Sequence, residues 1–293
     1  MKEKIYSGRI LRAISGFYWV ETDEGLIRCQ PRGVFRKQQC SPVVGDLVTC
    51  SVLSSHGTIL EIESRKNYFI RPPLANLDQL FFVVSTCKPT PNFFLLDQLL
   101  AITEYQQIEP VFLVTKCDLA PGNNIVKRYQ KAGFSVFCTN RMTEREIASF
   151  LDSLKGKVSA LCGNTGVGKS TFLNFLLPEL ALKTGETSEK LGRGRHTTRT
   201  VELFPIAGGY LADTPGFSTV TMERYGTIPK ESLQECFREF YLYLGKCRFH
   251  GCSHRAEPEC AVTEAVNKGL ISESRYQSYL RLYEMAEQRK NWN

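Results

Sequence analysis

Eight consecutive residues near the middle of the chain have the spacing of a phosphate-binding loop. They read Gly163-Asn164-Thr165-Gly166-Val167-Gly168-Lys169-Ser170, with Thr171 directly after. In the pattern G-x-x-x-x-G-K-[ST], backbone N–H groups surround the phosphates, the Lys reaches the β- and γ-phosphates, and the Ser hydroxyl binds Mg²⁺. An apolar strand is expected before the loop, at 158–162, and a helix after it. We therefore expect this segment to bind a nucleoside triphosphate with Mg²⁺.

A second motif, Thr115-Lys116-Cys117-Asp118, is a variant of the guanine-reading sequence N-K-x-D. It follows the apolar strand 111–114, and the carboxyl ends of strands are where α/β sheets bind ligands. Asp118 could accept hydrogen bonds from the guanine N1 and 2-amino groups, which adenine does not offer. Thr115 replaces the usual Asn, so one contact could be lost. Beside the phosphate loop, this motif favours GTP and GDP over ATP.

A third motif, Asp213-Thr214-Pro215-Gly216, follows the short strand 210–212. It matches D-x-x-G, whose Asp reaches Mg²⁺ and whose Gly N–H senses the γ-phosphate. The loop 191–199 before it is rich in Gly and Arg, and is suited to becoming ordered when nucleotide and metal bind. Either Thr197 or Thr198 could complete the Mg²⁺ shell; the sequence does not choose between them.

The residue after this motif bears on hydrolysis. Ras-like enzymes place a water-orienting Gln there, whereas this chain has Phe217, which cannot polarise water. We therefore expect slow intrinsic hydrolysis. Our hypothesis is that His196, or a group supplied by a partner, positions the water.

Three cysteines and one histidine lie in a short polar segment near the C-terminus. The spacing Cys247-x₄-Cys252-x-His254-x₅-Cys260 supplies three thiols and an imidazole, which suits a closed tetrahedral zinc site, with His250 as a competing ligand. Four protein ligands leave no open position, so we expect one structural Zn²⁺. Metal would substitute for a core in a segment with few apolar residues.

The motifs occur in an unusual order. The guanine motif precedes the phosphate loop, which precedes the Thr-containing loop and D-x-x-G; an ordinary GTPase has its guanine motif last. This is the order expected after circular permutation. Strand pairing depends on adjacency in space, so a permuted chain can keep the same sheet.

The elements around these motifs indicate a multi-domain α/β protein. Five short strands within the first 70 residues predict an OB-type β-barrel, and apolar strands alternating with helices then predict a mostly parallel sheet with helices on both faces. A C-terminal helical zinc-binding domain completes the chain, with a final helix at about 272–290. We place the domains at 1–71, 72–221 and 222–293.

Composition narrows the class of protein. The 293 residues are 42 % hydrophobic but contain no apolar run of about 18 residues and no signal-peptide pattern, which predicts a cytoplasmic protein that does not enter a membrane. The 11 cysteines are mostly scattered and are expected to be reduced. Net charge is +7, and residues 1–73 carry 11 Lys/Arg against 7 Asp/Glu. This positive surplus is as consistent with RNA binding as it is with an ordinary soluble surface. The basic residues Arg28, Arg32, Arg36 and Lys37 favour a phosphate-contacting loop on the barrel.

These motifs together resemble the RsgA (YjeQ) family of circularly permuted bacterial GTPases, and the resemblance covers nearly the whole chain. It implies GTP hydrolysis stimulated by the 30S ribosomal subunit, contact with 16S rRNA, action late in small-subunit maturation, and a monomer. One departure lies at 138–140, where a second guanine-contacting loop lacks its usual signature.

Two other readings remain open from the residues. The chain could be a zinc-containing RNA-binding adaptor in which GTP is a structural or regulatory ligand. It could also be an ATP-using P-loop kinase or ATPase, which Asp118 and the absence of an identifiable acceptor site disfavour.

Overall fold

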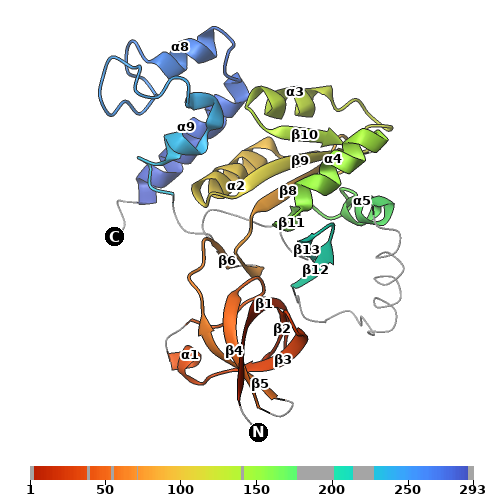
Figure 1. Ribbon diagram of the computed structural model, residues 1–293. Coiled ribbons are helices and arrows are strands. Elements are labelled where there is room, and N and C mark those ends of the chain that lie inside the picture. The colour runs from red at the N-terminus through yellow and green to blue at the C-terminus, as the bar shows by residue number, and fades with distance from the viewer. Residues whose placement is uncertain are drawn as a thin grey trace. The chain divides into compact units, whose positions relative to one another are not determined.

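A computed structural model describes residues 3–37, 40–53, 56–70, 72–139, 142–176, 201–213 and 228–289 (Figure 1). The described chain forms two compact units, each built from separated segments. The first contains residues 1–79, 143–162 and 169–218, and the second contains residues 80–142, 163–168 and 219–293.

The N-terminal part of the first unit is the expected barrel. Its strands are β1 (Lys4–Ile14), β2 (Phe17–Thr22), β3 (Gly25–Pro31), β4 (Leu47–Leu53) and β5 (His56–Ile62), with the one-turn helix α1 (Val34–Lys37) between β3 and β4. The barrel closes because β1 pairs with both β2 and β4, and β5 pairs with both β3 and β4. Ile10, Val20, Cys29, Val48 and Ile59 fill its interior and are fully buried. The strand pattern predicted from alternation is confirmed.

The rest of the first unit contains further strands and helices. These are β11 (Val158–Cys162), β12 (Glu202–Ile206) and β13 (Gly209–Asp213), with helices α4 (Glu144–Leu154) and α5 (Lys169–Leu176). Strands β11 and β13 are parallel, whereas β12 and β13 form an antiparallel hairpin. The rings of Phe150 and Phe172 pack edge to face and join α4 to α5. Strand β12 was not predicted, because its short run is broken by Pro205.

The second unit contains the other strands of the α/β core and the C-terminal segment. Its elements include β9 (Glu109–Thr115), β10 (Ser135–Cys138), α2 (Phe93–Tyr105) and α3 (Asn123–Lys131), with most of β8 (Gln79–Ser85). Every residue of β8 is buried, and in β9 all but the first are buried, as expected for strands covered on both faces. Helix α4, in the first unit, begins with a capping box between Thr143 and Glu146.

The C-terminal segment is partly helical. It consists of the 3₁₀ turns η3 (Leu233–Cys236) and η4 (Arg238–Phe240), helix α8 (Ala261–Asn267) and helix α9 (Glu273–Arg289). The small strands β6 (Tyr68–Ile70) and β7 (Pro73–Ala75) pair at the end of the barrel segment. Within the described ranges, no helix combines the length and the apolar character needed to cross a bilayer.

Candidate functional site

The guanine motif and the phosphate loop are in direct contact within the second unit. The Thr115 hydroxyl donates to the backbone carbonyl of Val167, and the Lys116 Nζ donates to the carbonyl of Gly166 at 2.8 Å and to that of Lys88. Thr115 therefore links two motifs that are about 50 residues apart in sequence. The sequence indicated only that Thr in place of the usual Asn could lose a contact to guanine. In the structure, Thr115 instead makes a contact to the phosphate loop.

Glycine is required where the phosphate loop passes strand β8. Gly163 has φ +147°, and a Cβ atom there would lie 2.4 Å from the carbonyl oxygen of Val83. Gly168 has φ +103°, a conformation that other residues rarely adopt. The two glycines allow the chain to turn tightly, and Lys169 then begins α5. This strand–turn–helix arrangement is the one that presents backbone N–H groups to phosphates.

A hollow of about 340 Å³ lies beside the guanine motif. Its lining includes Cys117 and Asp118 at one end of β9 and Cys138 at the end of β10. Strands β9 and β10 are parallel and in register from Val111 to Val114, so their carboxyl ends lie side by side. The segment at 138, where the sequence departs from the expected second guanine-contacting loop, therefore borders the same hollow as Asp118.

The D-x-x-G motif begins at the last residue of strand β13. Asp213 is the last residue of β13, and the register pairs Ala160 of β11 with Ala212. The backbone of Asp213 is thus next to the end of the strand that leads into the phosphate loop. The predicted residues His196, Thr197, Thr198, Gly216 and Phe217 lie outside the described residues.

The four predicted metal ligands come together. The ligand atoms of Cys247, Cys252, His254 and Cys260 all lie within 4.8 Å of one another. Sγ of Cys247 is 3.8 Å from Sγ of Cys260, and His254 Nδ1 is 3.5 Å and 3.3 Å from those two sulfurs. A tetrahedral ion with bonds of about 2.3 Å to sulfur and about 2.0 Å to nitrogen requires edges of about 3.5–3.8 Å. The cluster therefore fits a tetrahedral metal ion, and His250, which is exposed, is outside it.

A residue that the sequence did not single out orients the histidine. Nε2 of His254 is 2.9 Å from the side-chain oxygen of Gln234, while Nδ1 faces the two sulfurs. Nδ1 is therefore the nitrogen that would bind a metal ion, and Nε2 would then carry the hydrogen that Gln234 accepts. Metal-bound histidines commonly have such an outer partner. No spacing rule could have identified Gln234, since it precedes the cluster and is joined to it only by folding.

Helix α9 connects the metal-binding segment to the α/β core through buried polar groups. The hydroxyl of Tyr276 donates to the His254 carbonyl at 2.8 Å. One residue earlier, the fully buried guanidinium of Arg275 donates to Asp97 on α2, at 2.9 Å, and to both carboxylate oxygens of Glu239. Asp97 also accepts from Ser278 at 2.6 Å. The C-terminal segment is thus fixed to the core by a buried ion-pair network.

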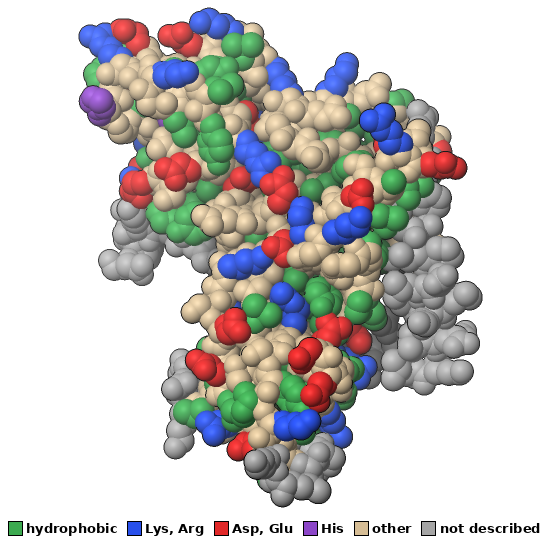
Figure 2. All heavy atoms as spheres, viewed as in Figure 1, with side chains coloured by type: hydrophobic (Ala, Val, Ile, Leu, Met, Phe, Trp, Pro, Cys, Tyr) green, Lys and Arg blue, Asp and Glu red, His purple; other side chains and the backbone are tan. Residues whose placement is uncertain are grey.

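The barrel carries arginine–aromatic pairs. The guanidinium carbon of Arg28 lies 3.7 Å from the ring centroid of Phe17. Stacked rings and arginine planes are the groups on which single-stranded nucleic acid stacks. The side chains of Arg36 and Lys37 are outside the described set. Figure 2 shows Lys/Arg and Asp/Glu side chains interspersed on the visible face, so charge does not mark a binding site on that face.

Comparison with protein families gives two matches. The model for the RsgA GTPase matches residues 62–223, and the model for the RsgA N-terminal domain matches residues 7–59. The small ribosomal subunit biogenesis GTPase RsgA of Caldanaerobacter subterraneus subsp. tengcongensis is 45 % identical over 280 residues, covering 94 % of each chain. The protein of the same name from Bacillus cereus is 43 % identical over 290 residues, covering 97 % of this chain and 98 % of its own.

Two solved structures resemble the whole chain. YloQ, described as a circularly permuted GTPase, has a TM-score of 0.79 and 32 % identity, over 98 % of this chain and 96 % of that one. YjeQ from Thermotoga maritima has a TM-score of 0.77 and 31 % identity, over 97 % and 99 %. The permuted order read from the motifs is therefore shared by a structural relative.

Proposed function

Since the chain belongs to the RsgA GTPase family and hydrolyses GTP, we propose that it acts on the small ribosomal subunit during its biogenesis. In this proposal the subunit stimulates hydrolysis, the protein works in the cytoplasm as a monomer, and it contacts 16S rRNA late in maturation. Relatives that match over nearly their whole length carry the name small ribosomal subunit biogenesis GTPase, which supports the small subunit as the partner. The contact of Thr115 and Lys116 with the phosphate loop is the observation that carries the nucleotide chemistry.

The residues of the nucleotide motifs have separate roles in this proposal. Asp118 reads the guanine edge, and the loop from Gly163 to Thr171 holds the phosphates. Lys116 connects the two by its bond to the Gly166 carbonyl, so the base site and the phosphate site are joined directly. Mg²⁺, when bound, neutralises phosphate charge; Ser170, Asp213 and either Thr197 or Thr198 are proposed to hold it.

The remaining assignments follow the same motifs. Gly216 is proposed to sense the γ-phosphate. Phe217 supplies no polar group for the attacking water, so His196 or a group of the subunit does so. Cys247, Cys252, His254 and Cys260 hold one structural Zn²⁺, whose role is to fold their segment. The domain boundaries at 71 and 221 are part of the proposal.

Turnover of GTP with and without purified 30S subunits tests the function. We expect stimulation of at least about tenfold, because the missing water-positioning group is then supplied or ordered. Binding of GTP without turnover in either condition would favour the zinc-containing RNA-binding adaptor instead. Preference for ATP would contradict both readings. His196→Ala should lower the stimulated rate; an unchanged rate would assign the water-positioning role to the subunit.

A further inference from the structure

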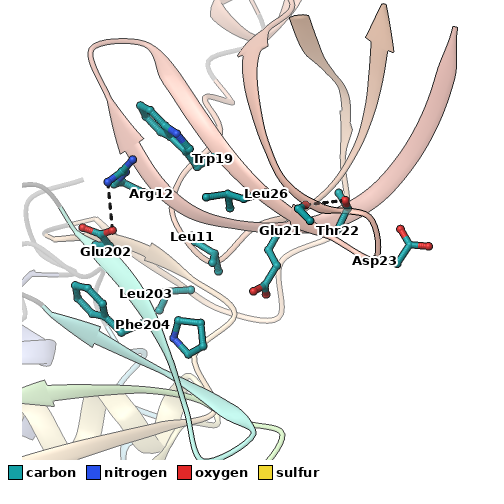
Figure 3. Close-up of a pocket in the computed structure, with 12 residues that line it drawn as sticks. Leu11, Arg12, Trp19, Glu21, Thr22, Asp23, Leu26, Glu202, Leu203 and Phe204 are labelled. Carbon is teal, nitrogen blue, oxygen red and sulfur yellow. Dashed lines mark hydrogen bonds and ion pairs between the residues drawn. The ribbon is translucent and has the colours of Figure 1, made fainter. Parts of the chain in front are cut away.

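A cleft of about 520 Å³ lies between the barrel strands β1–β3 and strand β12, within the first compact unit (Figure 3). Its lining is largely apolar. Leu11 and Leu203 are buried at its base, and Trp19 and Leu26 form the barrel side. Leu26 is 58 % exposed, which leaves apolar surface uncovered on the cleft wall.

The charge of the cleft is opposite to that of the whole protein. Glu21, Asp23 and Glu202 line it, against the single cation Arg12. Arg12 is 3.6 Å from Glu202, and its guanidinium carbon lies 4.3 Å from the Trp19 ring centroid. The chain carries +7 overall, yet this cleft has an excess of carboxylates. A phosphate backbone would be repelled here, whereas lysine and arginine side chains would be attracted.

The edge of β12 offers few groups to a peptide main chain. Strand β12 pairs with β13 along its length, and with β1 only at the position of Arg12 and Glu202. Pro205 interrupts the strand and has no N–H to donate. Arg12 Nε is buried, so a docked segment does not reach it. Recognition at the cleft therefore depends on its side chains.

We propose that this cleft binds an extended segment of a protein partner in which lysine or arginine residues flank an apolar side chain. The apolar side chain covers Leu26 and Trp19. The flanking cations face Asp23 and Glu21. The proposal rests on the proposed function in taking the partner from the small subunit, where proteins that contact RNA carry positive charge.

A photo-cross-linking experiment tests this proposal. The full chain carries p-benzoylphenylalanine in place of Leu26 and is irradiated with purified 30S subunits. We expect a cross-link to a subunit protein, at a Lys/Arg-rich segment identified by mass spectrometry. A cross-link only to rRNA, or none although the variant co-sediments with the subunit, would overturn the cleft proposal alone. Failure of the unmodified chain to co-sediment would overturn the proposed function as well.

A charge-reversal pair tests why the segment binds. Asp23→Lys should lower the cross-link yield at position 26 about fivefold, because like charges then meet in the cleft. Glu61→Lys makes the same charge change at an exposed barrel position that does not line the cleft, and should leave the yield unchanged. Equal yields for the two variants would contradict recognition by the acidic wall. GTP turnover without subunits serves as the folding control for both.

Discussion

At the scale of single residues, the backbone conformation of Lys116 places its side chain against the phosphate loop. Lys116 has φ 60°, a left-handed conformation that is uncommon outside glycine. Such strain persists only where surrounding contacts hold it, and here the carbonyl of Lys116 accepts from the Thr86 hydroxyl at 2.7 Å. The side chain is thereby directed to the carbonyl of Gly166. His254, in the metal cluster, has a comparable φ of 55°.

Asp118→Asn tests the base-reading role directly. An amide both donates and accepts, so it no longer matches the two N–H groups of guanine but does match xanthine. We expect GTP affinity to fall about 100-fold and XTP to become the better ligand. Titration of both nucleotides measures the change, with Asp152→Asn, at an exposed position of helix α4, as the control. Unchanged preference for GTP would remove Asp118 from the site.

Gln234→Leu tests the orientation of the metal-bound histidine. Loss of the acceptor leaves Nε2–H of His254 without its 2.9 Å partner, so metal affinity should fall about 10–100-fold. Gln234→Glu keeps an acceptor and should retain affinity. Competition for Zn²⁺ with a chromophoric chelator measures both, and Gln277→Leu, at an exposed position of α9, is the matched control. Equal affinity in the Leu and Glu variants would show that Gln234 does not support the metal.

At the scale of elements, helix α9 is fixed by charges that have no access to water. Arg275→Ala would leave the buried Glu239 without its cation, and Asp97 with Arg128 alone. We expect a loss of about 3–5 kcal/mol in the free energy of unfolding. Arg281→Ala, on the exposed face of the same helix, removes only a contact with the Phe94 ring and should cost about 1 kcal/mol or less. Urea unfolding of both variants measures the difference; similar losses would contradict the role of the buried network.

The packing of α2 against η4 predicts a pH dependence. Burial raises the pKa of Glu104 to about 7, although Arg238 lowers it and Glu109 raises it further. The folded protein therefore holds this proton more tightly than the unfolded chain, so the stabilisation is complete below about pH 4.5 and is lost as pH rises through about 7.

Glu104→Gln removes this titration and keeps the size of the side chain. We expect the Tm of the unmodified protein to fall relative to that of the variant by about 5 °C between about pH 5 and pH 8. Thermal unfolding across that range measures the difference. A Tm difference that is independent of pH, or that has the opposite sign, would contradict the raised pKa.

At the scale of the whole molecule, the contacts within the second unit connect the guanine motif to the C-terminal segment. Strand β9 ends in that motif, and its Phe112 stacks on Tyr129 with ring centroids 3.9 Å apart. Tyr129 donates to Asp97, which is paired with Arg275 of α9. Permutation also places the D-x-x-G motif directly before the C-terminal segment in sequence. Two routes therefore lead to the C-terminal segment: one through packing from the guanine motif, and one along the chain from the D-x-x-G motif.

We accordingly expect the nucleotide state to alter amide hydrogen exchange in residues 228–289. A non-hydrolysable GTP analogue should slow exchange around η3 and η4 relative to GDP, since these turns follow D-x-x-G most closely. Strands β4 and β5 of the barrel serve as the internal reference. Equal amide exchange in both nucleotide states throughout residues 228–289 would refute coupling between the D-x-x-G motif and the C-terminal segment.

The sequence by itself predicted which residues form the sites. The phosphate loop, the guanine motif and the metal ligands each consist of residues close together in the chain, where spacing limits geometry. The permuted order was readable from the succession of these motifs along the chain. Barrel and α/β strands were also readable, because alternation and continuous apolar runs report burial directly.

Only the tertiary structure decided how these parts are held. The bond from Thr115 to Val167, the support of His254 by Gln234, and the pairing of Asp97 with Arg275 join residues about 20 to 180 positions apart. The cleft between β1 and β12 likewise forms from distant segments, and one of its strands, interrupted by Pro205, had no recognisable pattern. Such contacts depend on packing of the folded chain, which leaves no local periodicity or spacing in sequence to identify them.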